Sequence, residues 1–304
     1  MCSIIESSDE YNYFRSSVPL RVIVVDNSAF SPGWKVYDCG PKHIRSPLVF
    51  LPPVSGTADI FFHLMLDLSR KGYRTLSAEH PPYWKVQDWC EGFKKLLDHY
   101  EFEKVHLFGA SLGGFLAQKF AEHTVLRPRV VSLFLCNSFY DTSVFNYSET
   151  YAIFRILPCV LLKKMVTGSL SVENTDVDIQ NSIEFMIRKL DTLQQSDIAS
   201  RLTLNCQSSK VDPSLLQGVP ITLMDVYDDY ALSYHVQETL VRIYPHAKRA
   251  TLKSGGNFPY LSRCDECVMH LQIHLRPFEN SPHSAKITGE IAVDTTEPCG
   301  SRDE

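Results

Sequence analysis

The 304-residue sequence has no long hydrophobic run and no excess of basic charge. No apolar stretch approaches the roughly 18 residues typical of a membrane-spanning helix. The formal net charge of −5 and the lack of a basic stripe exclude an electrostatic attraction for nucleic acid, so we expect no nucleic-acid partner. The first ten residues have neither the basic start nor the apolar core of a signal peptide, which favours a cytosolic protein.

Cysteine is too scattered for a disulfide framework. The nine cysteines are an odd number spread over the chain, which suits reduced thiols. The CxxC motif formed by Cys264 and Cys267 has no second pair and no Cys or His partner at zinc-ligand spacing. We therefore predict no metal site and no cofactor, and interpret this spacing as two cysteines on one helix.

The sequence does contain a regular alternation of strand-like and helix-like segments. Short apolar runs predict strands at residues 20–26, 34–38, 48–51, 73–78, 105–108, 130–136, 221–226 and 249–252. Periodic apolar spacing predicts helices at residues 60–71, 87–99, 115–122 and 265–275. Such β-α-β alternation predicts an α/β fold, with a mostly parallel central sheet, helices on both faces and a hairpin-like pair at its start.

The alternation stops between the strands at 130–136 and 221–226. Helical stretches at 151–166, 177–190 and 196–207 predict a helical cap, inserted at about residues 140–217 into a domain that spans 1–278. The apolar stretch 151–166, interrupted by Pro158, either packs over a pocket, which we favour, or contacts a membrane or a partner. Residues 279–304 are rich in Ser, Thr, Pro, Gly and charge, which predicts a disordered tail.

The motif that points to chemistry is Gly-Ala-Ser-Leu-Gly at 109–113, between a predicted strand and a predicted helix. This pattern is typical of a nucleophile elbow, a turn so sharp that small residues must flank the serine. Ser111 therefore takes the nucleophile position. The candidate donors for an oxyanion hole are the N–H groups of Val54 and Leu112, because the nearby Pro52 and Pro53 have no N–H.

A serine nucleophile also needs an acid after a late strand and a histidine base after the last strand. Asp228 and Asp229 follow the strand at 221–226; we favour Asp228 as the acid, although a role in capping the next helix explains it equally well. In the loop after the last strand, Asn257 replaces the histidine. Because an amide cannot take a proton from Ser111 near neutral pH, no standard triad can form.

Other histidines do not occupy a base position. His246 precedes the last predicted strand, and His270 and His274 lie inside the closing helix, where surface or packing roles explain them. The loss of the base in a comparable triad lowers turnover by about a million-fold. The sequence therefore favours a protein that does not catalyse hydrolysis.

Four segments, 50–59, 104–122, 200–207 and 254–261, closely resemble a member of the α/β-hydrolase superfamily. The resemblance covers roughly residues 10–278. Many hydrolases share the elbow, whereas Pro-Pro-Val-Ser-Gly-Thr-Ala-Asp at 52–59 and Gly-Gly-Asn-Phe-Pro-Tyr at 255–260 are specific. The resemblance implies the α/β-hydrolase fold and an intracellular protein without an established hydrolytic activity, cytosolic and peripherally associated with endosomal and trans-Golgi membranes.

The same resemblance implies protein partners. One is the cytoplasmic tail of a T-cell co-receptor, with a role as a negative regulator of T-cell activation, and another is an aldehyde dehydrogenase family member. From Asn257 and the pair Pro52 and Pro53, we favour a non-catalytic regulatory or adaptor protein. The alternative is a serine hydrolase or esterase that uses Ser111, with Asp228 in support and a non-standard base. A small-molecule sensor that retains the pocket beneath the cap overlaps the first hypothesis.

Overall fold

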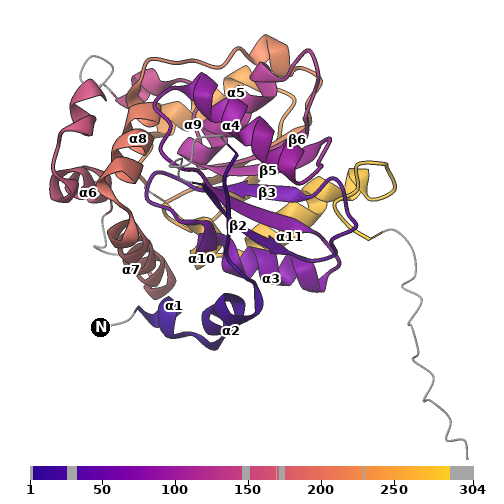
Figure 1. Ribbon diagram of the computed structural model, residues 1–304, viewed down its shortest axis with the longest axis horizontal. Helices are drawn as coiled ribbons and strands as arrows, with labels where there is room; N and C mark the ends of the chain where they lie inside the picture. The colour runs from indigo at the N-terminus through magenta and orange to yellow at the C-terminus, as the bar shows by residue number, and fades with distance from the viewer. Residues whose placement is uncertain are drawn as a thin grey trace, which may run out of the picture.

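The structure, a computed structural model, describes residues 3–25, 33–145, 151–168, 170, 175–228 and 230–287. In this part of the chain an eight-stranded sheet forms the centre, in the order β1-β2-β4-β3-β5-β6-β7-β8 (Figure 1). The strands are β1 Arg21–Ile23, β2 Trp34–Cys39, β3 Leu48–Leu51, β4 Thr75–Glu79, β5 Val105–Ala110, β6 Val130–Cys136, β7 Ile221–Val226 and β8 Lys248–Leu252. β2 is antiparallel to both of its neighbours, and β3 to β8 are parallel.

Helices cover both faces of the sheet, as predicted. Alternate residues of each strand point to opposite faces, so Leu48 and Phe50 join one buried cluster while Val49 and Leu51 join the other. The first cluster includes residues of α3 (Phe62–Arg70) and α11 (Cys264–Leu275). The second includes residues of α4 (Val86–His99), α5 (Leu112–His123) and α9 (Tyr234–Ile243), which lie on the opposite side of the sheet (Figure 1).

Most predicted bounds shift by only a few residues. β4 begins at Thr75 rather than at residue 73, because Tyr73 forms an isolated bridge with Lys286 and the Arg74 N–H donates to the Ala285 carbonyl. β1 is shorter than the predicted strand at 20–26, whose last residue lies outside the described ranges. The predicted helix at 60–71 begins as a 3₁₀ turn, η1 (Ala58–Phe61), and continues as α3.

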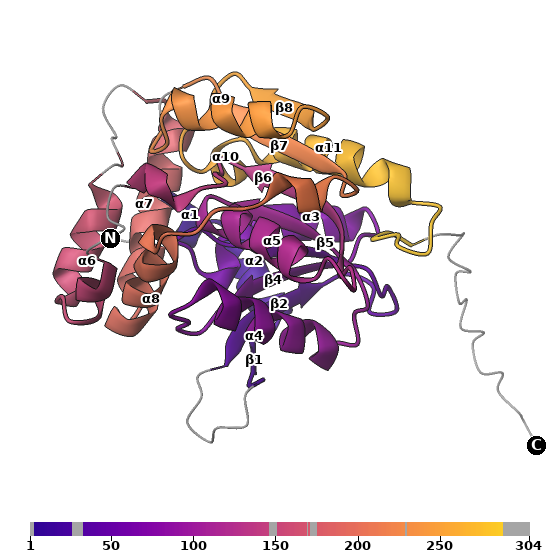
Figure 2. The same cartoon turned by 90° about the horizontal axis from the view of Figure 1, so that it is seen from above.

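Two short N-terminal helices were not predicted. α1 (Ile4–Ser7) and α2 (Asp9–Ser17) each begin after a serine whose side chain caps the first turn. Tyr11 and Phe14 of α2 are buried in the first cluster. Both helices lie near the end of α7 (Val177–Thr192) in two perpendicular views, and α1 contacts α7 (Figures 1 and 2).

The segment between β6 and β7 contains the cap helices. They are η3 (Tyr151–Arg155), α6 (Cys159–Thr167), α7 and α8 (Gln195–Cys206), gathered on one side of the sheet (Figure 2). Phe154, Leu162 and Leu202 belong to a small separate core. Pro158 divides the predicted helix at 151–166 in two, and on its outer side Ile156 and Val160 are 80% and 76% exposed. One side of the segment 151–166 therefore packs against the rest of the cap, and its other side is exposed to solvent.

The C-terminal segment is packed for nine residues beyond the predicted domain end at 278. Within residues 279–287, Tyr73 donates a hydrogen bond to Glu279, and Ala285 is buried. Residues 288–304 of the predicted tail lie outside the described ranges. The shorter helical elements are η2 Thr142–Phe145, η4 Pro213–Leu216, α10 Pro259–Ser262 and η5 Arg276–Phe278. Within the described ranges, no helix combines the length and apolar character needed to cross a bilayer.

Candidate functional site

Ser111 lies on the sharp turn between β5 and α5. Its backbone has φ 49° and ψ −114°, a conformation that is rare for a residue with a side chain. The turn is tight, because a Cβ on Gly109 would lie 2.4 Å from Gly114 Cα and a Cβ on Gly113 would lie 2.1 Å from the Leu51 carbonyl oxygen. The small residues of the motif thus let α5 approach β3 and β5 closely.

Asp228, the predicted acid, lies in the loop after β7. Its Oδ2 accepts hydrogen bonds from the N–H groups of Gly255 at 2.9 Å and Gly256 at 3.1 Å. Its Oδ1 is buried and has no hydrogen-bond partner among the described residues. Asp228 therefore holds the loop that follows β8. Asp229 lies outside the described ranges.

Asn257 belongs to that same loop. Its Oδ1 accepts a hydrogen bond from the Ala231 N–H at 2.8 Å, which ties the loop to the segment before α9. Among the described residues, no hydrogen bond joins the Asn257 side chain to Asp228 or to Ser111 Oγ. The three predicted positions thus do not form a hydrogen-bonded relay.

Asn137 is a part of the site that the sequence reasoning missed. It follows β6 with a positive φ of 45°, and its Nδ2 donates to the Gly256 carbonyl at 3.0 Å and the Asn257 carbonyl at 3.4 Å. It therefore links the end of β6 to the loop that carries Asn257. An asparagine directly after a predicted central strand was the available signal, because asparagine tolerates positive φ.

The oxyanion-hole candidates are positioned by the loop after β3 and by the start of α5. Among the described residues, no acceptor bonds to the N–H groups of Val54 or Leu112. Val54 lines the same cavity as Ser111, whereas Leu112 is a buried residue at the first position of α5. The N–H groups at a helix start have no partner within the helix, so the Leu112 N–H is available to an acceptor.

Arg201 of α8 fixes the Val54 loop from the cap side. Its side chain is 1% exposed, and Nη1 donates to the carbonyl oxygens of Val54 at 3.1 Å and Gly56 at 2.5 Å. Nη2 forms an ion pair with Glu79 Oε1 at 3.2 Å, and Glu79 Oε2 accepts from the Ala58 N–H. The signal for this role in the sequence was weak, an arginine within the helical segment predicted at 196–207.

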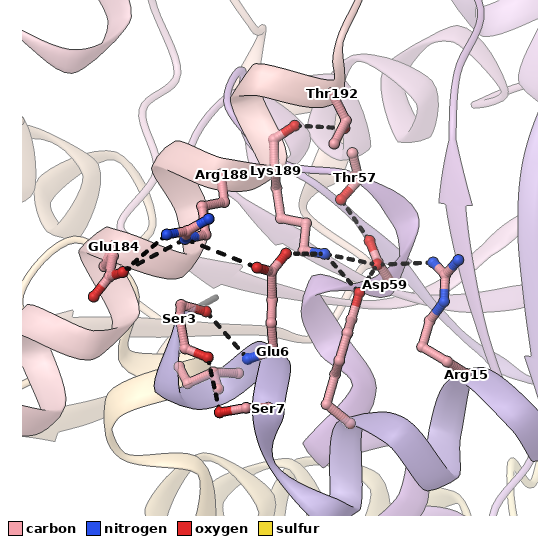
Figure 3. A network of polar contacts seen from close by, with 12 residues as sticks. Ser3, Glu6, Ser7, Arg15, Thr57, Asp59, Glu184, Arg188, Lys189 and Thr192 are labelled. Carbon is pink, nitrogen blue, oxygen red and sulfur yellow. Dashed lines mark hydrogen bonds and ion pairs between the residues drawn. The ribbon is translucent and has the colours of Figure 1, made fainter. Parts of the chain in front are cut away.

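A second polar group, the Asp59 cluster, fixes the far end of this loop. It consists of Tyr11, Arg15, Thr57, Asp59 and Lys189. Figure 3 labels the last four of these. Asp59 accepts hydrogen bonds from Tyr11 and Thr57, both at 2.5 Å, and pairs with Arg15 at 3.1 Å and Lys189 at 3.4 Å. Burial alone would raise the pKa of Asp59, but the Lys189 charge and the two hydroxyl donors lower it below its usual value.

Lys189 connects the cap to the N-terminal helices through this cluster. Its ammonium group donates to the Tyr11 hydroxyl at 2.6 Å. It also forms an ion pair with Glu6 at 3.0 Å (Figure 3). Burial and the nearby Asp59 carboxylate raise the pKa of Tyr11, so its hydroxyl stays protonated. The loop between β3 and α3 is thus attached to α8 by Arg201 and to α7 by Asp59.

The cap and the sheet enclose a cavity of about 230 Å³, called here the cap cavity. Ser111 and Asn257 both line it, together with Val54. The larger apolar side chains in its wall are Phe145, Phe154, Met165, Val166, Leu170, Leu202, Leu232 and Phe258. Its other polar lining residues are Ser55, Asn137, Asn205, Tyr230 and Tyr260. No described lining residue is Asp, Glu, Lys, Arg or His.

The histidines and cysteines singled out in the sequence lie elsewhere. His274 is buried in α11, where it contacts Ser132 and Thr222, and His270 is on the same helix. His246 lies between α9 and β8. Cys267 is buried with its Sγ 3.6 Å from Met224 Sδ, and Cys264 is at the first position of α11.

Comparison with known proteins identifies relatives over most of the chain. No protein-family model matches it. It is 52% identical over 281 residues to maspardin of Homo sapiens, covering 92% of this chain and 91% of that protein. It is also 52% identical over 281 residues to maspardin of Danio rerio, covering 92% of this chain and 90% of that protein.

Solved structures resemble the chain in fold alone. An enol-lactonase from Burkholderia xenovorans has a TM-score of 0.66 at 15% identity, over 80% of this chain and 96% of that one. A carboxylesterase from the thaumarchaeon Nitrososphaera gargenis has a TM-score of 0.64 at 16% identity, over 85% of this chain and 100% of that one. These neighbours confirm the predicted α/β-hydrolase fold.

Proposed function

The chain belongs to the maspardin family of α/β-hydrolase-fold proteins, and from this premise we propose that it is a non-catalytic regulatory or adaptor protein. The observation that carries the proposal is the position of Asn257. It lines the cap cavity with Ser111, in the loop where a triad base belongs, and its Oδ1 accepts a hydrogen bond from the Ala231 N–H. Since a carboxamide cannot accept the proton of Ser111, this arrangement supports binding rather than acyl transfer.

A second candidate function, a serine hydrolase or esterase, is favoured by the geometry of the elbow. Ser111 keeps the strained conformation of a nucleophile, and the Val54 and Leu112 N–H groups are open to an acceptor. This function needs a non-standard base. It ranks second because no described residue in the wall of the cap cavity is a histidine or a carboxylate.

We propose protein partners for the adaptor role. By resemblance to the family, these are the cytoplasmic tail of a T-cell co-receptor, through which the protein would negatively regulate T-cell activation, and an aldehyde dehydrogenase family member. The proposed location is the cytosol, with peripheral association with endosomal and trans-Golgi membranes. The outer side of η3 and α6 supports a contact role, because Ile156, Val160 and Leu161 are exposed there beside Lys164.

Labelling with a fluorophosphonate tests the absence of catalysis. We expect no Ser111-dependent labelling or ester turnover by the unmodified protein, with Ser111→Ala as its matched control. Asn257→His places an imidazole in the loop held by Asp228, whose Oδ1 is free to accept its N–H. We expect this variant to label at a rate at least about tenfold above the background measured with Ser111→Ala, given the million-fold cost of losing a base. Labelling of the unmodified protein, lost in Ser111→Ala, would favour the hydrolase instead.

Binding to a co-receptor tail peptide tests the adaptor role separately. Val160→Asp places a charge on the exposed side of α6, and we expect it to weaken binding at least about tenfold. Leu126→Asp is the matched control, because Leu126 is 94% exposed beyond the end of α5. Equal binding by both variants and the unmodified protein would exclude this surface of the cap.

A further inference from the structure

The cap cavity has polar groups that the adaptor role does not use. Four of its lining side chains have an oxygen without a hydrogen-bond partner among the described residues. One is the hydroxyl of the partly exposed Tyr230, and three belong to buried residues: Asn137 Oδ1, Asn205 Oδ1 and the Tyr260 hydroxyl. Their residues are 3%, 6% and 1% exposed. Buried polar atoms in folded proteins are nearly always paired, and an unpaired atom destabilises the fold. These three atoms therefore mark positions where a bound molecule can supply the missing partners.

The orientation of Asn137 is determined by its contacts. Its Nδ2 donates to the Gly256 carbonyl at 3.0 Å, and a carbonyl oxygen can only accept, so the other amide atom is the oxygen. Asn137 therefore presents an acceptor that requires a donor. Burial keeps the Tyr260 hydroxyl protonated by raising its pKa, so this group can both donate and accept.

Other lining groups of the same cavity are hydrogen-bond donors. Ser111 has a hydroxyl, and the Val54 N–H bonds to no acceptor among the described residues. Asn257 Oδ1 already accepts from the Ala231 N–H, which leaves its Nδ2 as a further donor. A molecule that pairs with both sets of groups must contain an acceptor for these donors and a donor for the asparagine oxygens.

The charge of the wall restricts the ligand further. No described residue that lines the cavity is charged, and most of the wall is apolar. A charged molecule would lose its hydration there without a counter-ion, which is costly. The ligand is therefore neutral, and its size is limited by a volume below the 300 to 1,000 Å³ that is usual for drug-sized sites.

We propose that the cap cavity binds a small neutral carboxamide with an apolar chain, without forming a covalent bond. The amide carbonyl accepts from the Ser111 side, and the amide NH₂ donates to the asparagine oxygens. Asn205 can pair with such a group reciprocally, because two carboxamides each offer one donor and one acceptor. An ester has no donor, and a carboxylate has neither a donor nor a counter-ion in this wall.

Titration of the full-length protein with hexanamide, methyl hexanoate and hexanoate, each at millimolar concentration, tests the proposal. These three molecules share one chain length and differ in the head group. We expect hexanamide to bind at least about fivefold more tightly than the other two, from the hydrogen bonds that only it can form. Hexanamide should be recovered unchanged, and the mass of the protein should not increase.

Two variants locate the binding site. Asn205→Leu removes the acceptor at similar volume, and we expect it to weaken hexanamide binding about five- to tenfold and leave methyl hexanoate unaffected. Leu202→Trp fills the cavity and should abolish binding of both molecules. Asn12→Leu, at an exposed position of α2, is the matched control.

The proposal is overturned if the three molecules bind equally, if none binds, or if Leu202→Trp leaves hexanamide binding intact. If either variant fails to fold, as judged by circular dichroism, the order of the three molecules with the unmodified protein still decides. Release of hexanoate from the amide would also overturn it, and would favour the hydrolase. Failure of amide binding alone leaves the adaptor proposal standing, since that depends on Asn257 and on protein partners.

Discussion

At the scale of single residues, the backbone of Ser111 is strained by its neighbours. A non-glycine residue with φ 49° and ψ −114° costs on the order of 1 to 3 kcal/mol. The strain persists because Gly109 and Gly113 let α5 pack against β3 and β5, which fixes the turn between them. The elbow is therefore part of how the fold closes, whether or not its serine reacts.

Replacing the strained residue should stabilise the protein. Ser111→Gly removes the Cβ that makes this conformation unfavourable, while the greater freedom of glycine in the unfolded chain offsets about 0.5 to 1 kcal/mol. We expect a net gain of about 1 kcal/mol over Ser111→Ala, which also lacks the hydroxyl but keeps the Cβ. Urea unfolding of both variants measures the difference. Equal stability of the two would contradict the strain argument.

The sequence predicted some residues of the candidate site and not others, for a physical reason. Ser111 and Asn257 follow strands of a parallel sheet, whose carboxyl ends lie at one edge, so their meeting in one cavity follows from the strand order. Asn205 and Tyr260 lie within helical segments, where the sequence does not show which side faces a cavity. Their contribution depends on how the cap packs, and that requires tertiary structure.

At the scale of elements, buried charges attach the cap to the sheet domain. Lys189 of α7 and Arg201 of α8 are 6% and 1% exposed. Both contact the segment between β3 and α3: Lys189 pairs with Asp59, and Arg201 donates to two backbone carbonyl oxygens. The central strands were predicted because each is a short, nearly continuous apolar run. α1 and α2 were not, because elements of four and nine residues carry little periodicity and depend on the serine caps and on contacts with α7 and α3.

Removing the charge of Lys189 should loosen the N-terminal helices. Lys189→Met keeps the apolar stem but leaves Glu6 and buried Asp59 without this cation, and breaking such a pair typically costs about 3 to 5 kcal/mol. Arg15 still faces Asp59, so we expect the lower value, about 3 kcal/mol. Hydrogen exchange should show faster exchange of the amides of α1 and α2.

The control for this variant is Lys94→Met. Lys94 pairs with Asp98 at 3.5 Å on the exposed surface of α4, where such pairs contribute less than about 1 kcal/mol. The argument fails if both lysine variants lose the same stability, or if exchange in α1 and α2 does not change.

At the scale of the whole molecule, the sheet contains a buried chain of hydrogen bonds between uncharged groups. His106 Nε2 lies 2.8 Å from the His283 carbonyl and must donate to it, so its Nδ1 accepts from Ser132 Oγ at 2.7 Å. Ser132 in turn accepts from His274 Nε2 at 2.7 Å, and His274 Nδ1 accepts from Thr222 at 2.8 Å. The chain crosses β5, β6 and β7 and requires both imidazoles to be neutral.

Burial makes these imidazoles hard to protonate, which predicts how stability depends on pH. Burial lowers the pKa of His106 to about 4 and of His274 to about 3, and it lowers the pKa of His80 to about 3. In the unfolded chain each titrates near its ordinary value of about 6.5. Between these values the unfolded state binds more protons, so the free energy of unfolding falls as the pH falls.

One carboxyl opposes this trend and provides the control. Burial raises the pKa of Asp225 to about 6, so as the pH falls from about 6 toward 4 the folded state takes up a proton before the unfolded state does, and stability rises. These three histidines and one aspartate leave a net difference of about two protons, so we expect these four groups to contribute a decline of about 3 kcal/mol per pH unit between 6 and 4. Urea unfolding at several pH values measures this slope. Asp225→Asn removes the opposing group, so the decline in the free energy of unfolding should become steeper by about 1.4 kcal/mol per pH unit, which corresponds to one proton. If the free energy of unfolding of either protein stays constant or increases as the pH falls from 6 to 4, the buried histidines do not control acid stability.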